Sequence, residues 1–333
     1  MSTEERPSKR PRDEDSELET LVKRSADYWF QDGSIVLQVE STQFRVAKTV
    51  LAMHSTIFSD MLSFPPANDP LVEGCPLVLI SGDKSTDWKH LLDAMYPTHC
   101  FNDDRPEFMA LAAVLRLSNK YDIPLFRQRC IARLKSEFPS SLSSFDTAFK
   151  LDGWQNIAMP ADWTMSKISV AVINLAREVG LYSVLPVAFY TIVNRYGANV
   201  EMDGILSDVL DGLHSRADEI ICLRGHARMT RDYLQTPIKC FAPEGRIPST
   251  TCAQPAMCRS TAQRHLLSCL KEVSLVAAVV DEWYIGWEAS DFCPDCAAEA
   301  KQVFEQTRAE CWDKLPSYFA LPPWDDLLKM DLE

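Results

Sequence analysis

Residues 32–64 read DGSIVLQVESTQFRVAKTVLAMHSTIFSDMLSF, and this stretch decides the fold. The apolar run Ile35–Val39 and a second short piece with Phe44 and Val46 predict two strands joined by a polar turn. Apolar residues then recur at helical spacing, at Val50, Leu51, Met53, Ile57, Phe58, Met61 and Leu62. Ser55 lies between the two helical pieces, where its hydroxyl can cap the second. We therefore expect a strand hairpin that leads into a pair of short helices.

The periodicity continues in the same manner to residue 138. A short apolar run predicts a buried strand at Pro76–Ile80. Amphipathic patterns predict three helices, at Asp87–Tyr96, Pro106–Tyr121 and Ile123–Phe138. Asp83 or Ser85 is the expected N-cap of the first of these helices. Residues 139–163 are mixed in character and are predicted to be rich in loops. The fold class is therefore α+β.

The motifs of this region resemble those of the BTB (POZ) domain. In the opening stretch the matching positions are Phe44, Lys48, Leu51, Ser55, Phe58, Met61 and Leu62. Further along, they are Trp88, Leu91, Leu92, Tyr96, Leu117, Lys120, Tyr121, Ile123, Leu125 and Cys130. The resemblance implies a BTB/POZ fold over residues 27–138, a small sheet with a helical cluster. It also implies homodimerisation through the first helix and the N-terminal strand region, where apolar residues can serve either a core or an interface.

Two features of the family bear on partners. The family's polar pocket combines a basic residue, here Lys48, with an aspartate whose position holds Ser34, so the pocket is half missing. The histidine that usually precedes the basic residue is Ala47. This departure counts against corepressor recruitment. Leu71-Val72-Glu73 resembles the hydrophobic-x-Glu motif of cullin-binding BTB proteins, which makes Leu71 and Glu73 candidate partner-binding residues.

The rest of the chain divides into two parts. Residues 1–26 form a charged tail that we expect to be disordered, and its cluster Lys9, Arg10 and Arg12 is a candidate nuclear import signal. Residues 139–333 are predicted to be mostly helical, and they resemble the helical continuation of many fungal BTB proteins. The expected helices are Ser166–Val179, Leu181–Tyr196, Ile205–Ala217, Ile220–Gln235, Arg259–Glu282 and Phe292–Trp312. Gly180 should end the first, Cys240–Met257 should be a loop, and a tail rich in proline and aromatic residues should pack back onto the helices.

The amino-acid composition limits the classes to which the protein can belong. The chain has 333 residues, 46% of them hydrophobic, which is enough for a large core. Its net charge of −13 argues against nucleic acid as the main partner. No apolar run is long enough to span a membrane, and the hydrophilic N-terminus is unlike a signal peptide. We therefore expect an intracellular protein, in the nucleus, the cytoplasm or both, whose eleven cysteines stay reduced.

Some of the cysteines have the spacing of metal ligands. Cys293 and Cys296 form a C-x2-C turn at a helix start, and Cys252 and Cys258 form a C-x5-C pair in a loop. Two such pairs can complete a tetrahedral site, so these four are the candidate ligands of a structural zinc ion. Pairs on helices offer alternative ligands, namely Cys222 with His226 and His265 with Cys269. The plain alternative is that these cysteines are buried small residues.

The sequence contains no catalytic motif that we would assign. Dinucleotide and phosphate-binding loops, HExxH and G-x-S-x-G are all missing. We therefore expect a non-enzymatic protein–protein interaction module that self-associates, recruits protein partners and serves as substrate adaptor of a cullin-type ubiquitin ligase. The alternatives are a nuclear regulator linked to transcription and a plain scaffold. A thiol oxidoreductase that uses Cys293 and Cys296 is a weaker alternative, because it needs an exposed thiol of lowered pKa.

Overall fold

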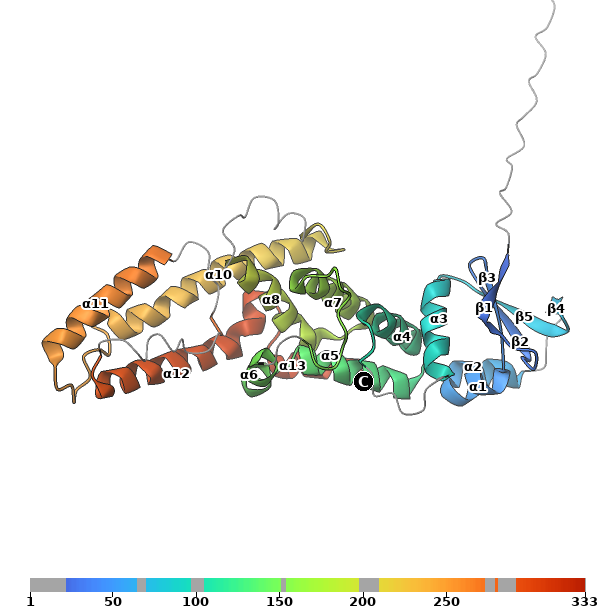
Figure 1. The fold of residues 1–333 in the computed structure, drawn as a ribbon, viewed down its shortest axis with the longest axis horizontal. Coiled ribbons are helices and arrows are strands. Elements are labelled where there is room, and N and C mark those ends of the chain that lie inside the picture. Colours follow the sequence, from blue (N-terminus) through green and yellow to red (C-terminus); the bar gives the residue numbers. More distant parts are fainter. Residues whose placement is uncertain are drawn as a thin grey trace, which may run out of the picture.

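The computed structural model describes residues 22–64, 70–96, 105–150, 154–197, 210–272, 279–280 and 292–332. The molecule is elongated, with its sheet at one end and the long helices α10, α11 and α12 at the other (Figure 1). α10 runs outward to the tip of the molecule, and α12 runs back from the tip toward the middle. The C-terminal helix α13 then returns to the middle of the molecule.

Five strands form the described sheet, in the order β1-β3-β2-β5-β4. β2 (Ile35–Val39) and β3 (Thr42–Val46) make the antiparallel hairpin that the opening stretch predicts. β5 (Cys75–Ile80) lies parallel to β2, and β4 (Leu71–Val72) is a short edge strand. β1 (Lys23–Trp29) pairs in parallel with β3. Residues 23–26, which we expected in the charged tail, therefore belong to the sheet.

Short helices follow the hairpin as expected. α1 (Lys48–His54) and α2 (Thr56–Ser63) meet at Ser55, whose hydroxyl oxygen accepts a hydrogen bond from the Phe58 amide at 3.1 Å. The three amphipathic patterns become α3 (Ser85–Met95), α4 (Phe108–Lys120) and α5 (Pro124–Glu137). The expected cap of α3 is wrong, because the N-cap is Lys84, whose side chain makes no capping hydrogen bond. The Glu40 carboxylate instead accepts from the Ser85 amide at 2.9 Å. Asp83 instead turns toward α3 and α4.

The helical part begins earlier than predicted. α6 (Leu142–Lys150) lies within the segment expected to be loop. α7 (Met165–Val179) ends at Gly180, whose φ of 78° is the left-handed conformation that favours glycine. The remaining elements are η1 (Tyr182–Val184), α8 (Leu185–Gly197), α10 (Arg216–Phe241), α11 (Pro255–Glu272), α12 (Pro294–Tyr318) and α13 (Trp324–Met330).

Several predicted ranges need correction. The expected helix Ile220–Gln235 is longer at both ends, and the expected loop Cys240–Met257 is shorter, because α10 includes its first two residues and α11 its last three. Residues 210–215 of the expected helix Ile205–Ala217 include a turn, and residues 205–209 lie outside the described part. Of the expected helix Arg259–Glu282, residues up to 272 are helical, whereas residues 279–280 are a turn. α12 is longer than predicted, since it continues past residue 312 to Tyr318. No helix in the described ranges combines the length and the apolar character that a membrane crossing requires.

One hydrophobic core runs from the sheet into the helical part. Phe108 of α4 and Phe138, just after α5, both contact the ring of Trp154, with centroids 6.5 Å and 5.2 Å away. Trp154 precedes α7, which packs against α4. The two parts of the chain therefore share buried side chains, and burial of the same apolar surface stabilises both.

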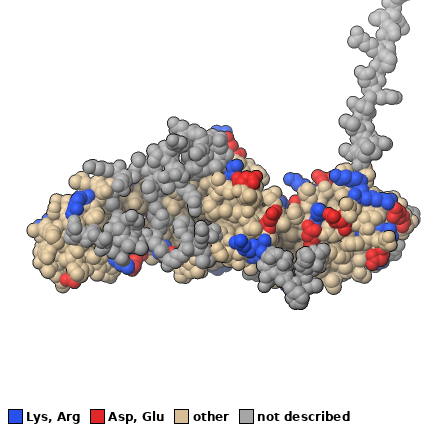
Figure 2. All heavy atoms as spheres, in the orientation of Figure 1, with Lys and Arg blue, Asp and Glu red and all other residues tan. Residues whose placement is uncertain are grey.

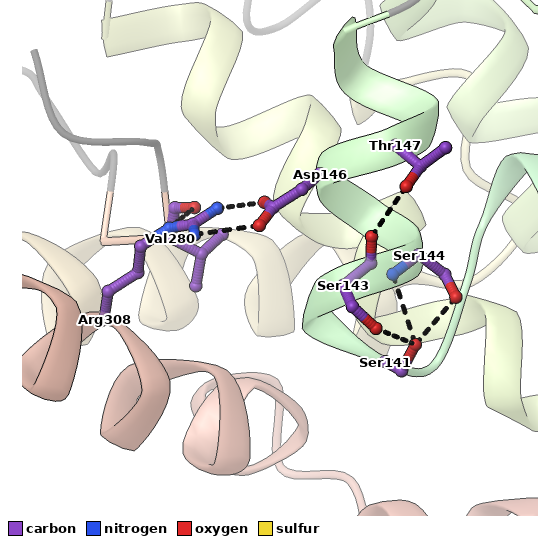
Figure 3. A network of polar contacts seen from close by, with 7 residues as sticks. All are labelled: Ser141, Ser143, Ser144, Asp146, Thr147, Val280 and Arg308. Atoms are coloured by element: carbon purple, nitrogen blue, oxygen red, sulfur yellow. Dashed lines mark hydrogen bonds and ion pairs between the residues drawn. The ribbon is translucent and has the colours of Figure 1, made fainter.

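Figure 3 shows how α6 is held to the distant helix α12. The guanidinium group of Arg308 donates to both carboxylate oxygens of Asp146, and its Nε donates to the carbonyl of Val280 at 2.8 Å. The Arg308 side chain is only 10% exposed. At the start of α6, the Ser141 hydroxyl accepts from the Ser144 amide at 3.3 Å and so caps the helix.

The C-terminal tail packs back onto the body, as the sequence predicts. The indole ring of Trp324 stacks on Trp312 with centroids 5.4 Å apart, and its Nε1 donates to the Trp312 carbonyl. Beyond α13, a carboxylate oxygen of Asp331 accepts from the Ser183 amide at 2.8 Å, and the other lies 2.7 Å from Nζ of Lys135. The tail therefore joins α5 to the helical part.

Candidate functional site

The α1–α2 pair separates core residues from exposed ones. Leu51 and Phe58 are 0% and 1% exposed and belong to the core. Four other apolar side chains are exposed, and they are Met53 at 72%, Ile57 at 46%, Met61 at 37% and Phe64 at 71%. Ile57 and Met61 are four residues apart and lie on one face of α2, and Phe64 follows at the C-cap in an extended conformation. We call these four residues the α1–α2 stripe.

At the position of the family's polar pocket, this chain has two hydroxyl groups that accept hydrogen bonds from backbone amides at the start of α1. The Ser34 hydroxyl oxygen accepts from the backbone amide of Lys48 at 3.0 Å, at the start of α1. The Tyr96 hydroxyl accepts in the same way from the amide of Ala47 at 3.2 Å. The side chain of Lys48 is exposed. Ser34 therefore orients the start of the helix and does not supply the negative charge that an aspartate would.

The two candidate partner-binding residues near β4, Leu71 and Glu73, differ in how accessible they are to a partner. Leu71 on β4 is 65% exposed. Glu73 follows in the turn between β4 and β5, where its carboxylate contacts Arg24 at 2.6 Å and Arg45 at 3.1 Å. The apolar member of this motif is thus accessible, whereas the acidic member already has two basic partners.

Charged side chains on the face drawn in Figure 2 are mixed in sign over the sheet end of the molecule. Several of them pair within the chain, such as Lys89 with Asp27 at 2.6 Å. Such surface pairs contribute little to stability, about 0–1 kcal/mol each.

The four cysteines predicted to bind metal come together at the far end of the helical part. Cys252 lies in the loop after α10, and Cys258 lies in the first turn of α11. Cys293 is the N-cap residue of α12, and Cys296 lies in the first turn of that helix. All four sulfur atoms lie within 4.8 Å of one another, and three of the four residues are buried. We call this set the four-cysteine cluster.

The geometry of the cluster fits a tetrahedral ion. A Zn–S distance of about 2.3 Å places the sulfur atoms of a tetrahedral site about 3.8 Å apart. The sulfur atoms of Cys252 and Cys293 are 3.6 Å apart. That separation excludes a disulfide, whose sulfur atoms are about 2.05 Å apart. The described cysteines are all free thiols.

Backbone amides surround the four sulfur atoms. The amide of Cys293 donates to Sγ of Cys258 at 3.4 Å, and the amide of Ser249 donates to Sγ of Cys296 at 3.3 Å. The amides of Cys296 and Gln254 act on the thiols of Cys293 and Cys252 in the direction that lowers their pKa. Backbone amides thus act on all four thiols, and such groups stabilise the thiolate form that binds a metal.

Backbone amides and desolvation act in opposite directions on the pKa values of the four thiols. The amide of Cys296 lowers the pKa of Cys293 to about 7. Desolvation raises the pKa of the other three thiols. Cys293 is 8% exposed and Cys296 is fully buried, whereas a redox dithiol needs an accessible sulfur. The arrangement therefore suits a metal ligand set better than a catalytic dithiol.

Among the described residues, the alternative ligands Cys222, His226 and His265 do not join this cluster. Cys222 lies in the main core, among residues that α10 buries against the body. The ring of His265 lies against Phe241 and Phe292, with centroids 5.8 Å and 5.4 Å away. The side chain of Cys269 lies outside the described part, as do Lys9, Arg10 and Arg12 of the candidate import signal.

Sequence reasoning missed two parts of these sites. Phe64 extends the α1–α2 stripe, and it lies just beyond the last residue of α2, so helical spacing gives no signal for it. The amide donors of Ser249 and Gln254 have no signal in the sequence, because any residue type can supply a backbone amide.

Comparison with known proteins agrees with this geometry. A search of curated proteins found no match for the chain. A family model described as BTB/POZ domain matches residues 31–137. The match spans β2 to α5, which are the hairpin, the α1–α2 pair and the three helices described above. This part of the chain is therefore a BTB/POZ domain, a protein–protein interaction module, and it continues into the helical part.

Proposed function

We propose that the protein self-associates through the α1–α2 stripe and recruits a second protein, as an interaction module without catalytic function. The observation that carries the proposal is the exposure of Met53, Ile57 and Phe64 beside a fully buried core. Covering such a stripe removes apolar surface from water, which contributes about 25 cal/mol per Å². A second copy of the chain offers the same stripe, so a symmetric dimer covers both at once.

Light scattering on a sizing column tests the self-association. We expect the wild-type chain at twice its mass of 37.7 kDa. Ile57→Asp places a charge in the stripe and should return the protein to the monomer, because an unpaired charge is costly to bury. Leu223→Asp is the matched control, since Leu223 is 51% exposed and belongs to α10, a helix that Figure 1 shows well away from α1 and α2. It should leave the dimer intact. A monomeric wild-type chain would refute the proposal.

The finer form of the proposal is a substrate adaptor of a cullin-type ubiquitin ligase. Exposed Leu71 on β4 supports it, since an apolar side chain at a sheet edge suits partner contact. Adding a cullin N-terminal fragment to the wild-type protein should produce a heavier complex, and Leu71→Asp should weaken it. Should the fragment leave the elution mass unchanged, the scaffold alternative would take its place, with the helical part as the surface that holds other proteins.

A nuclear regulator is the second candidate function. It rests on the basic cluster Lys9, Arg10 and Arg12 in the sequence. Replacing these three residues with alanine should move a tagged protein out of the nucleus. An unchanged distribution of the tag would remove the import signal from the proposal.

The four-cysteine cluster supports a structural zinc ion in the helical part. Four thiolates are a closed tetrahedral ligand set, which leaves no position for a substrate or a water molecule. Metal analysis of the purified, reduced protein should give one zinc per chain. Cobalt substitution should produce the visible absorption of tetrahedral thiolate coordination, and its failure to appear would argue against the site.

A further inference from the structure

We propose that metal binding at the four-cysteine cluster controls the folding of the far end of the helical part alone. This inference rests on the zinc site proposed above. We define the distal module as residues 240–272 and 292–303, which cover the end of α10, the loop after it, α11 and the first turns of α12. The zinc ion would decide whether this module is ordered, while the BTB domain keeps its fold either way.

The distal module has a core of its own. Its buried residues form a cluster separate from the main core: Cys240, Phe241, Ile247, Cys258, Ala262, Cys293, Cys296 and Ala300. Three of these eight are members of the four-cysteine cluster. Hydrophobic cores of such small size rarely stabilise a fold without a disulfide or a metal ion. The module therefore depends on the ligand set for much of its cohesion.

The position of α11 strengthens this dependence. α11 packs along α10, and in the described part of the chain its backbone comes close to that of α12 at few places. The four-cysteine cluster is the place where the start of α11 meets the start of α12, through Cys258 and Cys293. Figure 1 shows both helix starts at the outer tip of the molecule. Without a bound ion, the described residues hold these two starts together through thiol contacts, the amide hydrogen bond of Cys293 and the small apolar core that they share.

The long helices keep an anchor elsewhere. α10 buries Cys222 and Met229 in the main core, and α12 buries Trp312 and Leu315 there. Arg308 of α12 is also bound to Asp146 of α6. These contacts do not involve the four-cysteine cluster, so the inner halves of both helices should remain folded when the metal is removed.

Hydrogen exchange of the full-length protein, read by mass spectrometry with and without zinc, tests the inference. Zinc content is measured on the same samples. Removing zinc with a chelator under reducing conditions should speed exchange in the distal module by more than about tenfold, as expected for local opening. Exchange in α7, α8 and the BTB domain should not change.

A pair of variants supplies the control. Cys258→Ala removes a ligand, so it should abolish zinc binding and open the distal module. Cys240→Ala removes a buried thiol of the same core that is not in the ligand set, so it should keep one zinc and a protected module. If zinc binds but its removal leaves the module protected, or opens the BTB domain too, the inference is wrong and the zinc site stands. If no zinc binds, both fail.

Discussion

Asp83 connects three parts of the BTB domain through one carboxylate. Its oxygens accept from the indole nitrogen of Trp88 at 2.9 Å, the hydroxyl of Tyr121 at 2.6 Å and the amine of Lys120 at 2.5 Å. Burial alone would raise the pKa of Asp83, but these hydrogen bonds outweigh it and lower the pKa below its usual value. Asp83 was predicted as a helix cap, but it links α3 to α4.

Replacing this carboxylate should cost stability in a pH-dependent way. We expect Asp83→Asn to lower the free energy of unfolding at pH 7 by about 1–3 kcal/mol, since it leaves buried donors poorly matched. The folded pKa lies below the unfolded value of about 3.9, so the stabilisation is complete above that pH and is lost as the pH falls through the folded pKa. Urea unfolding from pH 7 to pH 3 should show the difference between wild type and variant shrinking in acid. A constant difference would contradict this account of the carboxylate.

Gly225 marks a close approach between α10 and the chain after α12. A Cβ atom built there would lie 2.4 Å from a ring carbon of Phe319, which is itself fully buried. Alanine in a helix is normally favoured over glycine by about 1 kcal/mol. Here the overlap with Phe319 should make alanine less favourable than glycine.

We expect Gly225→Ala to destabilise the protein by about 1–3 kcal/mol, in thermal or urea unfolding. Adding Phe319→Leu should relieve the overlap, so the double variant should be less destabilised than the sum of the single ones. A Gly225→Ala variant more stable than wild type would show that the ring can move aside freely.

At the level of elements, local patterns predicted most helices and the hairpin, because apolar periodicity reports a face that must be buried. β1 and α6 were missed for a common reason. Lys23–Trp29 carries several charged and exposed side chains, and its strand conformation follows from pairing with β3. α6 is rich in serine, and its anchor Arg308 lies 162 residues away from Asp146. Such long-range partners leave no local pattern.

The candidate sites also contain features that sequence spacing predicts and features that it does not predict. The C-x2-C and C-x5-C spacings identified all four cysteines of the cluster, because ligand spacing is a property of the sequence. The spacing of apolar residues in the sequence identified those of α1 and α2. It did not show which of them are buried and which are exposed, since helical periodicity is the same for a core and for an interface. Only burial separates Phe58 from Ile57.

Asp331, the residue after α13, should hold the C-terminal tail in place. Asp331 is buried, and its carboxylate holds the amide of Ser183 and the amine of Lys135. Asp331→Ala should leave both groups without their partner and lower the free energy of unfolding by about 1–3 kcal/mol. Limited proteolysis should then release the tail earlier than in wild type. Asp326→Ala, an exposed position on the same helix, is the control and should behave like wild type.

The whole molecule combines a BTB domain with a helical part on one continuous core, and a second small core lies at the far tip. This arrangement places the α1–α2 stripe at one end and the four-cysteine cluster at the other, as the element order in Figure 1 shows. Self-association and metal binding should therefore act independently, because no buried contact is shared between the two sites.

Hydroxyl-radical footprinting of the wild-type protein, read by mass spectrometry, examines the α1–α2 stripe without any substitution. Met53 is 72% exposed in the single chain, and Met330 on α13 is 49% exposed. If the stripe forms the contact between two copies, Met53 should be oxidised more slowly than Met330 at concentrations where the protein self-associates, and dilution should reverse the order. Oxidation of Met53 that stays faster than that of Met330 at every concentration would show that the stripe remains open to solvent, and self-association through it would be ruled out.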